Sequence, residues 1–267
     1  MIARGLTILI AAPIITACIY FGGMSFYILV TLLAIISVNE FYNLVEIKGF
    51  HPAFIIGNLA TFVFMTFAQV MLKHPDWEAS AAAFFTAAVI VTMFSGIFHR
   101  KLRSIGNIAV TIMGIIYVGW LFSYLVLLRA MSNYGKYLFF LLAVIWAGDV
   151  TAYLVGKFIG RTKLEPNISP KKTVEGALAG FAVSLLVAVL FGYYLIHINI
   201  IHSAILGVLI AITSQMSDLV ESIIKRDVGA KDSSRLLPGH GGVLDRMDSF
   251  ILSAPIIYYY ISWFILK

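Results

Sequence analysis

Apolar residues occur along this chain in long runs that short polar connections separate. A helix that crosses a bilayer needs about 20 mostly apolar residues. The runs predict nine spans, near residues 5–21, 24–45, 53–72, 79–98, 105–128, 137–156, 174–196, 201–223 and 249–266. Two connections are long and polar, 157–173 and 224–248. We therefore expect an all-α fold, a polytopic transmembrane helical bundle of about nine spans.

Composition supports a lipid environment for the surface of this bundle. Hydrophobic residues make up 61% of the 267 and charged residues 12%, against about 45–50% and about 25% in soluble domains. The chain shows no internal repeat or soluble linker, so we expect a single membrane domain over residues 1–267. Within it, the helices of 1–130 would form a scaffold, and the helices and loops of 137–267 would carry the chemistry. The first span is rich in small residues and offers a face for a homodimer.

The distribution of charge predicts the orientation of the bundle. The net charge of +6 is compatible with nucleic acid or with an anionic surface. With nine spans, fifteen Lys and Arg residues fall on the side of the N-terminus and four on the other. The positive-inside rule places the fifteen in the cytoplasm. Membrane topology thus accounts for the charge, and we expect no nucleic-acid partner.

A second interpretation exists for the first span. Ile15-Thr16-Ala17-Cys18, after an apolar stretch that begins near Arg4, resembles a lipoprotein cleavage box. The same residues also suit a first span whose small side chains pack against neighbouring helices. We favour the span, because eight further spans follow. The single cysteine, Cys18, excludes an internal disulfide.

Ionisable residues near membrane depth are rare and are functional candidates by default. Asp149 and Asp218 each precede the cytoplasmic end of a span by seven residues, which places both about 10 Å inside their helix ends. The span of Asp218 also carries a polar stripe at helical spacing, made by Ser214, Asp218, Glu221, Ser222 and Lys225. The alternative interpretation is that the stripe forms hydrogen bonds between helices. This would account for the serines but not for two carboxylates on one face. We favour a functional role for the stripe.

The polar connection 224–248 combines glycines, a histidine and acids. Glycines on both sides of His240, with Gly241 and Gly242 directly after it, allow a tight turn and bring backbone N–H groups close to a ligand. A helix is expected to begin directly after them, with Asp245 and Asp248 on one face of its first turn. Helix capping needs only one acid. Two acids beside a glycine loop indicate ligands for a hard cation such as Mg²⁺.

The connection 157–173 ends in a similar way. Ser169 and Pro170 suit the start of the seventh span, or Thr173 caps a slightly later start. Lys171 and Lys172 have two interpretations that the sequence supports equally: they mark the cytoplasmic side of the membrane, or they bind phosphate. Two positive helix ends and these cations thus meet a layer of four aspartates, an arrangement that fits a metal-bound polyphosphate. Glu40, near the cytoplasmic end of the second span, is either functional or interfacial.

The segment from Ser222 to Asp248 resembles the signature of the phosphatidate cytidylyltransferases, also called CDP-diacylglycerol synthases. The matching elements are Ser222, Lys225-Arg226, Lys231-Asp232, Pro238, His240-Gly241-Gly242, Asp245-Arg246 and Asp248. The stretch from Ser169 to Thr173 and the segment around Asp149 are also similar to the family. Ser217 stands before Asp218 where the family has glycine. The resemblance is strong over about 145–250 and rests on hydropathy and length before that.

The resemblance implies an enzyme that transfers CMP from CTP to phosphatidic acid, giving CDP-diacylglycerol and pyrophosphate for phospholipid biosynthesis. A phosphate monoester is already anionic at neutral pH, so the nucleophile needs no general base. The implied location is a bacterial-type inner membrane, with the catalytic loops and N-terminus in the cytoplasm. Phosphatidic acid would enter sideways between helices from the membrane lipids.

The resemblance also implies roles for individual residues. Asp218, Asp245 and Asp248, with Asp149 as a further candidate, would hold Mg²⁺ and, if two ions bind, a second cation. Lys171, Lys172, Lys225 and Arg226 would neutralise the triphosphate or the lipid phosphate, and His240 with its glycines would line the α- or β-phosphate. The remaining expected contacts to the nucleotide come from Thr173, Ser222, Lys231, Gly241, Gly242 and Arg246.

Three other functions compete with this one. A CDP-alcohol phosphotransferase would concentrate its aspartates in one short helical motif that begins Asp-Gly, and this chain has no such run. A CTP-dependent kinase of a lipid alcohol is chemically closer. A lipid or anion transporter would show inverted repeats and polar residues in broken helices at the midplane. The polar residues here instead cluster near one face.

Overall fold

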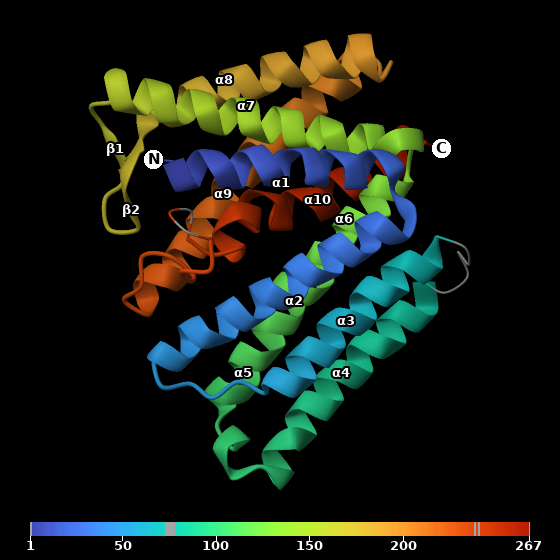
Figure 1. The fold of residues 1–267 in the computed structure, drawn as a ribbon, viewed down its shortest axis with the longest axis vertical. Helices are drawn as coiled ribbons and strands as arrows, with labels where there is room; N and C mark the ends of the chain where they lie inside the picture. The colour runs from blue at the N-terminus through green and yellow to red at the C-terminus, as the bar shows by residue number, and fades with distance from the viewer. Residues whose placement is uncertain (1, 73–77, 238, 240, 267) are drawn as a thin grey trace.

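The structure is a computed structural model, and it describes residues 2–72, 78–237, 239 and 241–266, with the backbone alone for 2–11, 78 and 79. Figure 1 shows a bundle of long helices with one small β-hairpin at its edge. The helical elements are α1 (Ile2–Phe21), α2 (Gly23–Ile47), α3 (Phe54–Met71), α4 (Glu78–Phe98), η2 (Arg100–Leu102), α5 (Ile105–Gly114), η3 (Ile115–Trp120), α6 (Leu121–Ala130), η4 (Asn133–Gly135), α7 (Lys136–Phe158), α8 (Val174–Leu190), η5 (Phe191–Leu195), α9 (Ile200–Asp227) and α10 (Leu244–Phe264).

Each of the nine predicted spans corresponds to one helical segment in the described part of the chain, the fifth being the continuous run α5–η3–α6. Seven segments among the described residues are long and apolar enough to cross a bilayer. The other two are α1, which contains Cys18, and α10. The expected all-α membrane helical bundle is confirmed.

The last helix begins earlier than the predicted span. Helix α10 starts at Leu244, directly after the glycines as expected, whereas hydropathy placed the span at 249–266. Its first turns contain Asp245 and Asp248, whose side chains lie against protein rather than lipid. Hydropathy alone therefore misses the start of this helix.

The core joins both halves of the chain. Buried apolar residues from α2, α6, α7, α9 and α10 form one cluster that includes Phe41, Phe122, Phe140, Leu206 and Ile251. The fifth span contains the π-helical turn η3, and such turns occur often at functional sites. Tyr117 in η3 is buried, and its hydroxyl has no hydrogen-bond partner among the described residues.

Glycines let helices α7 and α8 pack closely. A Cβ added at Gly180 would lie 2.9 Å from the carbonyl oxygen of Gly148, and one added at Gly176 would lie 2.6 Å from the carbonyl oxygen of Ala152. Small residues at such interfaces allow close backbone approach in membranes. The packing holds the end of α7 against the start of α8.

A short hairpin, absent from the sequence prediction, connects α7 to α8. Strands β1 (Lys163–Glu165) and β2 (Ser169–Thr173) are antiparallel, with Lys163 opposite Thr173. Ser169 and Pro170 therefore lie in a strand, and the expectation that they begin the seventh span is wrong. The alternative is confirmed: Thr173 is the N-cap, and its hydroxyl oxygen accepts a hydrogen bond from the Gly176 N–H at 3.2 Å.

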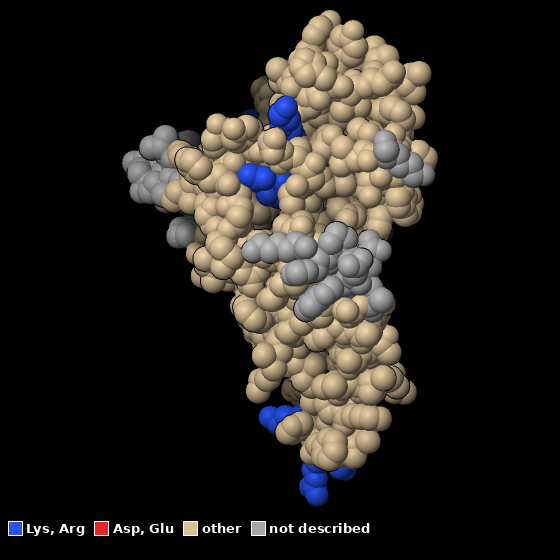
Figure 2. All heavy atoms as spheres, turned by 90° about the vertical axis from the view of Figure 1, so that its right-hand side faces the viewer, with Lys and Arg blue, Asp and Glu red and all other residues tan. Residues whose placement is uncertain are grey.

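The polar connections gather on one side of the bundle. In Figure 1 the hairpin, the N-terminus and the α9–α10 connection lie on the left, and the C-terminus lies on the right. Figure 2 shows the right-hand face, where Lys and Arg are sparse and no Asp or Glu is visible among the described atoms. Among the described atoms, this face therefore carries a few basic residues and no visible acid.

Candidate active site

Three carboxylates converge where helices α9 and α10 meet. Asp218, Glu221 and Asp248 each offer an oxygen, and these three atoms lie within 4.8 Å of one another. Asp218 and Glu221 share one face of α9 because they are three residues apart. The position of Asp248 is fixed by the Ser217 hydroxyl, which donates to its backbone carbonyl, and by the Ser249 N–H, which donates to its carboxylate at 2.7 Å. The first turns of α10 therefore face the polar stripe of α9.

Glu221 is the member of this group that the sequence-based assignment of ligands left out. Its side chain is fully buried, and neither oxygen accepts a hydrogen bond among the described residues. Its carboxylate contacts the ammonium of Lys225, one turn along α9. Burial of a carboxylate is costly unless it is paired, and Lys225 is the described cation that pairs with Glu221.

Asp245 makes a different set of contacts from Asp248. One of its oxygens lies 2.6 Å from the ammonium of Lys225, and the other accepts from the N–H groups of Ser233 and Gly242, each at 2.8 Å. It does not belong to the three-carboxylate group in the described structure. Asp245 therefore binds its own loop and links it to Lys225, which also contacts Glu221.

The glycines before α10 are required by these contacts. Gly241 has φ +82°, which L side chains rarely adopt. A Cβ added at Gly242 would lie 2.0 Å from the Ser233 hydroxyl oxygen and 2.5 Å from a Glu40 oxygen. His240 and Pro238, which the sequence placed in this loop, lie outside the described residues.

Glu40 reaches the same loop from helix α2. It is 4% exposed, and its carboxylate accepts hydrogen bonds from the Ser233 and Ser234 hydroxyls and from the Val243 and Leu244 N–H groups. The sequence alone was compatible with either a functional or an interfacial role for Glu40. Its position in a span was the only signal, since its partners lie about two hundred residues away.

A cavity of about 750 Å³ opens beside the carboxylates. Lys172 on β2 enters it, and its ammonium lies 2.5 Å from Asp218 Oδ2. The residues expected from the sequence that line this cavity are Asp149, Lys171, Lys172, Thr173, Asp218, Lys225, Asp245, Arg246 and Asp248. Lys157, Lys163, Gln215 and Asp232 also line it; the sequence predicted a site role for none of them, although Asp232 belongs to the family signature. The two lysines were counted only as topology signals.

Other expected residues lie around this cavity rather than on its wall. The Arg226 side chain donates to the carbonyl oxygens of Ile168 at 3.1 Å and Ala230 at 2.9 Å, which ties the end of α9 to the hairpin. Ser222 is buried on α9, and Lys231 is exposed in the loop. Gly241 and Gly242 shape the loop that holds Asp245.

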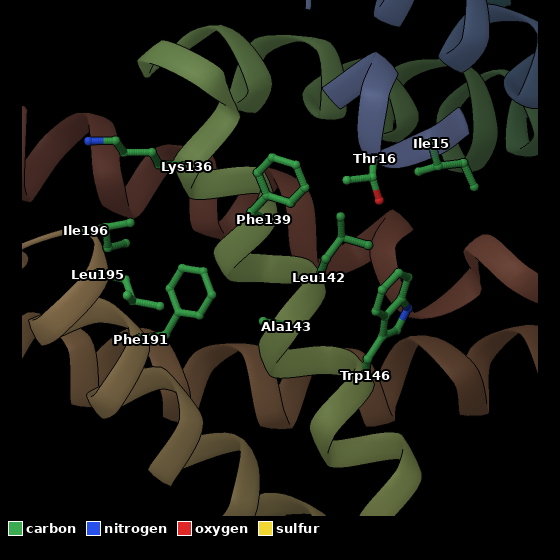
Figure 3. Close-up of a pocket in the computed structure, with 10 residues that line it drawn as sticks. All are labelled: Ile15, Thr16, Lys136, Phe139, Leu142, Ala143, Trp146, Phe191, Leu195 and Ile196. Carbon is green, nitrogen blue, oxygen red and sulfur yellow. The ribbon is translucent and has the colours of Figure 1, made fainter. Parts of the chain in front are cut away.

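A second cavity, of about 350 Å³, lacks the groups that phosphate chemistry needs. Figure 3 shows its mostly apolar lining from α1, α7 and the η5 region, with Thr16 as a polar residue and Lys136 as the one charged residue among those described. No carboxylate lines it among the described residues. The chemistry of the molecule is therefore assigned to the first cavity.

The fold and this site together define a polytopic membrane protein with carboxylates and lysines around one cavity near a helix N-terminus. The chain belongs to the cytidylyltransferase family, whose model matches residues 2–264. It is 37% identical to the phosphatidate cytidylyltransferase of a Synechocystis species over 90% of this chain and 89% of that protein. The enzyme of the same name from Bacillus subtilis is 31% identical over 98% of this chain and 97% of that protein. The family resemblance of the sequence is confirmed.

Proposed function

We propose that this protein transfers CMP from CTP to phosphatidic acid, giving CDP-diacylglycerol and pyrophosphate. The names of its relatives support the reaction. The observation that carries the proposal is the group of three carboxylates within 4.8 Å of one another, two of which, Asp218 and Asp248, line a cavity that lysines also line. A neutral lipid alcohol would require a general base, whereas a phosphate monoester is already anionic.

The reaction forms one bond and breaks one. An oxygen of the phosphatidic acid phosphate bonds to the α-phosphorus of CTP, and the bond from that phosphorus to the oxygen bridging to the β-phosphate breaks. Pyrophosphate leaves with the bridging oxygen. The main obstacle is repulsion between two polyanions, so the site must supply positive charge and alignment.

We assign a divalent cation, Mg²⁺, to Asp218, Glu221 and Asp248. Three converging carboxylates fit a hard, oxygen-preferring ion, and the buried oxygens of Glu221 pair with Lys225 but accept no hydrogen bond from a described residue. When bound, the ion would neutralise charge on the phosphate oxygens. Asp149 lines the same cavity outside this group and is our candidate for a second cation.

The lysines of the hairpin are proposed to bind phosphate. Lys171 and Lys172 line the cavity beside the N-cap of α8 at Thr173, where free N–H groups and the helix dipole favour anions. Lys163 on β1 adds a further cation to the same wall. Lys225 contacts both Glu221 and Asp245. We propose that its ammonium reduces the repulsion between these two carboxylates and fixes their orientation.

We further propose that the site faces the cytoplasm of a bacterial inner membrane. Fifteen of the nineteen Lys and Arg residues fall on the side of the N-terminus and the polar loops. Phosphatidic acid would enter sideways from the bilayer, leaving its acyl chains among lipids. A homodimer through the small-residue-rich first span stays a prediction.

The test uses purified protein in detergent with phosphatidic acid and CTP labelled at the α-phosphate. We expect label in the organic phase with Mg²⁺ and none after chelation. Glu46→Gln, on the exposed face of α2, serves as a matched control for site variants. Label that stays aqueous, while CTP labelled at the γ-phosphate marks a lipid alcohol, would overturn the proposal in favour of a kinase.

A further inference from the structure

The N-terminus of helix α10 is capped by a residue from the other end of the chain. Helices usually begin with a side-chain oxygen at the N-cap that accepts from the first free N–H groups. The N-cap of α10 is Val243, which has no such oxygen. Glu40 accepts from the Val243 N–H at 3.1 Å and from the Leu244 N–H at 2.8 Å. A buried carboxylate thus replaces the missing local cap.

Glu40 also holds the loop that precedes α10. One of its oxygens accepts from the Ser234 hydroxyl at 2.5 Å, and the other lies 3.2 Å from the Ser233 hydroxyl. The Ser233 hydroxyl oxygen is also 2.8 Å from Asp245. Since a hydroxyl has one proton, it donates to Glu40 or to Asp245 at any moment. Ser233 therefore couples the two carboxylates.

Polar contacts continue from this loop to the proposed metal ligands. Asp245 contacts the ammonium of Lys225 at 2.6 Å, and Lys225 contacts Glu221. Glu221 belongs to the carboxylate group with Asp218 and Asp248. Each of these links is buried or half-buried, so water screens it weakly. A change at Glu40 thus has a contiguous route to the ligands.

We infer that Glu40 is a positioning residue for the reaction: it fixes the N-terminus of α10 and the Ser233–Ser234 turn, and thereby sets the geometry of the Asp218, Glu221 and Asp248 carboxylates. The inference rests on the proposed cytidylyl transfer. It gives the N-terminal helices a part in catalysis beyond that of a scaffold, because α2 supplies the residue.

A purely structural cap is the competing explanation. In that case loss of Glu40 would lower stability, but each molecule that remains folded would work normally. A positioning role differs, because partners that support metal ligands change metal affinity or activity by about 10–100-fold when they are altered. Turnover and metal affinity, each measured per folded molecule, therefore distinguish the two explanations.

The experiment compares Glu40→Gln with the wild type and with Glu46→Gln, an exposed change on the same helix. Glu40→Gln keeps the side-chain size but removes the charge and one of the two accepting oxygens. Each variant is purified in detergent, and its folded fraction is taken from size exclusion and thermal unfolding. Steady-state kinetics with CTP and Mg²⁺ are then measured, with Mn²⁺ binding followed by electron paramagnetic resonance without nucleotide.

We expect kcat to fall about 10–100-fold in Glu40→Gln, with a smaller change in KM for CTP, and Mn²⁺ binding to weaken by about tenfold. Ser233→Ala should give a smaller loss of kcat. The double variant should be no worse than Glu40→Gln alone, because both changes act through one network. Glu46→Gln should match the wild type in every measurement.

Wild-type kcat and Mn²⁺ affinity per folded Glu40→Gln molecule would overturn the inference and leave a structural cap. Fully additive losses in the double variant would overturn the route through Ser233. An inactive wild type that still binds Mn²⁺ would instead count against the proposed function, so the two failures are distinguishable.

Discussion

The ammonium of Lys172 lies 2.5 Å from Oδ2 of Asp218, and this ion pair joins the hairpin before α8 to helix α9. Asp218 is also one of the three converging carboxylates. The lysine that we assign to phosphate therefore pairs with a carboxylate that we assign to the metal. A bound cation and Lys172 would share or compete for that side chain.

This competition makes Lys172→Met informative. We expect the variant to lose at least about tenfold in turnover, because a phosphate contact is gone. Mn²⁺ binding without nucleotide should be unchanged or tighter, since Asp218 loses a competing cation. Electron paramagnetic resonance of Mn²⁺ measures the second effect. Weaker Mn²⁺ binding in this variant would contradict the assignment of Asp218 as a ligand.

Asp248 and Asp245 should respond differently to removal of their charge. Asp248→Asn and Asp245→Asn are both expected to abolish turnover without preventing membrane insertion. Metal binding should be lost in Asp248→Asn, whereas Asp245→Asn should retain most of it, because Asp245 contacts Lys225 and its own loop rather than the carboxylate group. Equal loss of Mn²⁺ binding in both variants would show that Asp245 is a direct ligand, and near-normal turnover in Asp245→Asn would refute its role.

The Glu221–Lys225 pair should couple stability to activity. Lys225→Met leaves fully buried Glu221 without its counter-ion, and breaking a buried pair in this way costs about 3–5 kcal/mol. Glu221→Gln combined with Lys225→Met should recover much of the free energy of unfolding but not turnover. Denaturant unfolding in detergent, with kinetics on the folded fraction, measures both. Restored turnover in the double variant would argue against a role for Glu221 as a ligand.

Close packing of α7 on α8 should be required for the site. Gly176→Val would push side-chain atoms against the Ala152 carbonyl oxygen, which lies 2.6 Å from the position of a Cβ. The start of α8, with Lys172 and Thr173 beside it, should then move away from α7. We expect lower thermal stability and lower turnover. Leu178→Val, at an exposed position on α8, is the control and should resemble the wild type.

Gly242→Ala tests the loop in front of α10 by steric means. Its methyl group would overlap the Ser233 hydroxyl and a Glu40 oxygen. We expect the same pattern as in Glu40→Gln, with reduced kcat and weaker Mn²⁺ binding in molecules that remain folded. Activity equal to that of the wild type would show that this loop tolerates displacement.

The fold class and the family can both be predicted from the amino-acid sequence alone. Membrane burial selects long apolar runs, because a helix satisfies its backbone hydrogen bonds internally, so hydropathy located each helical segment of the bundle, apart from the first turn of α10. Acids at helical spacing on α9 indicate phosphate chemistry, and the gapped signature that ends at Asp248 indicates the family. These signals are local or follow a fixed spacing.

Which acids form the three-carboxylate group, and which bind the loop instead, depends on how the helices pack. Asp245 and Asp248 are three residues apart, yet one turns to Lys225 and the other to the carboxylate group. Glu221 joins that group because α10 packs against α9, and Glu40 caps α10 because α2 passes beside it. Hydropathy and helical spacing describe one segment at a time. Contacts between residues two hundred positions apart depend on how helices pack, and they became visible only in the folded chain.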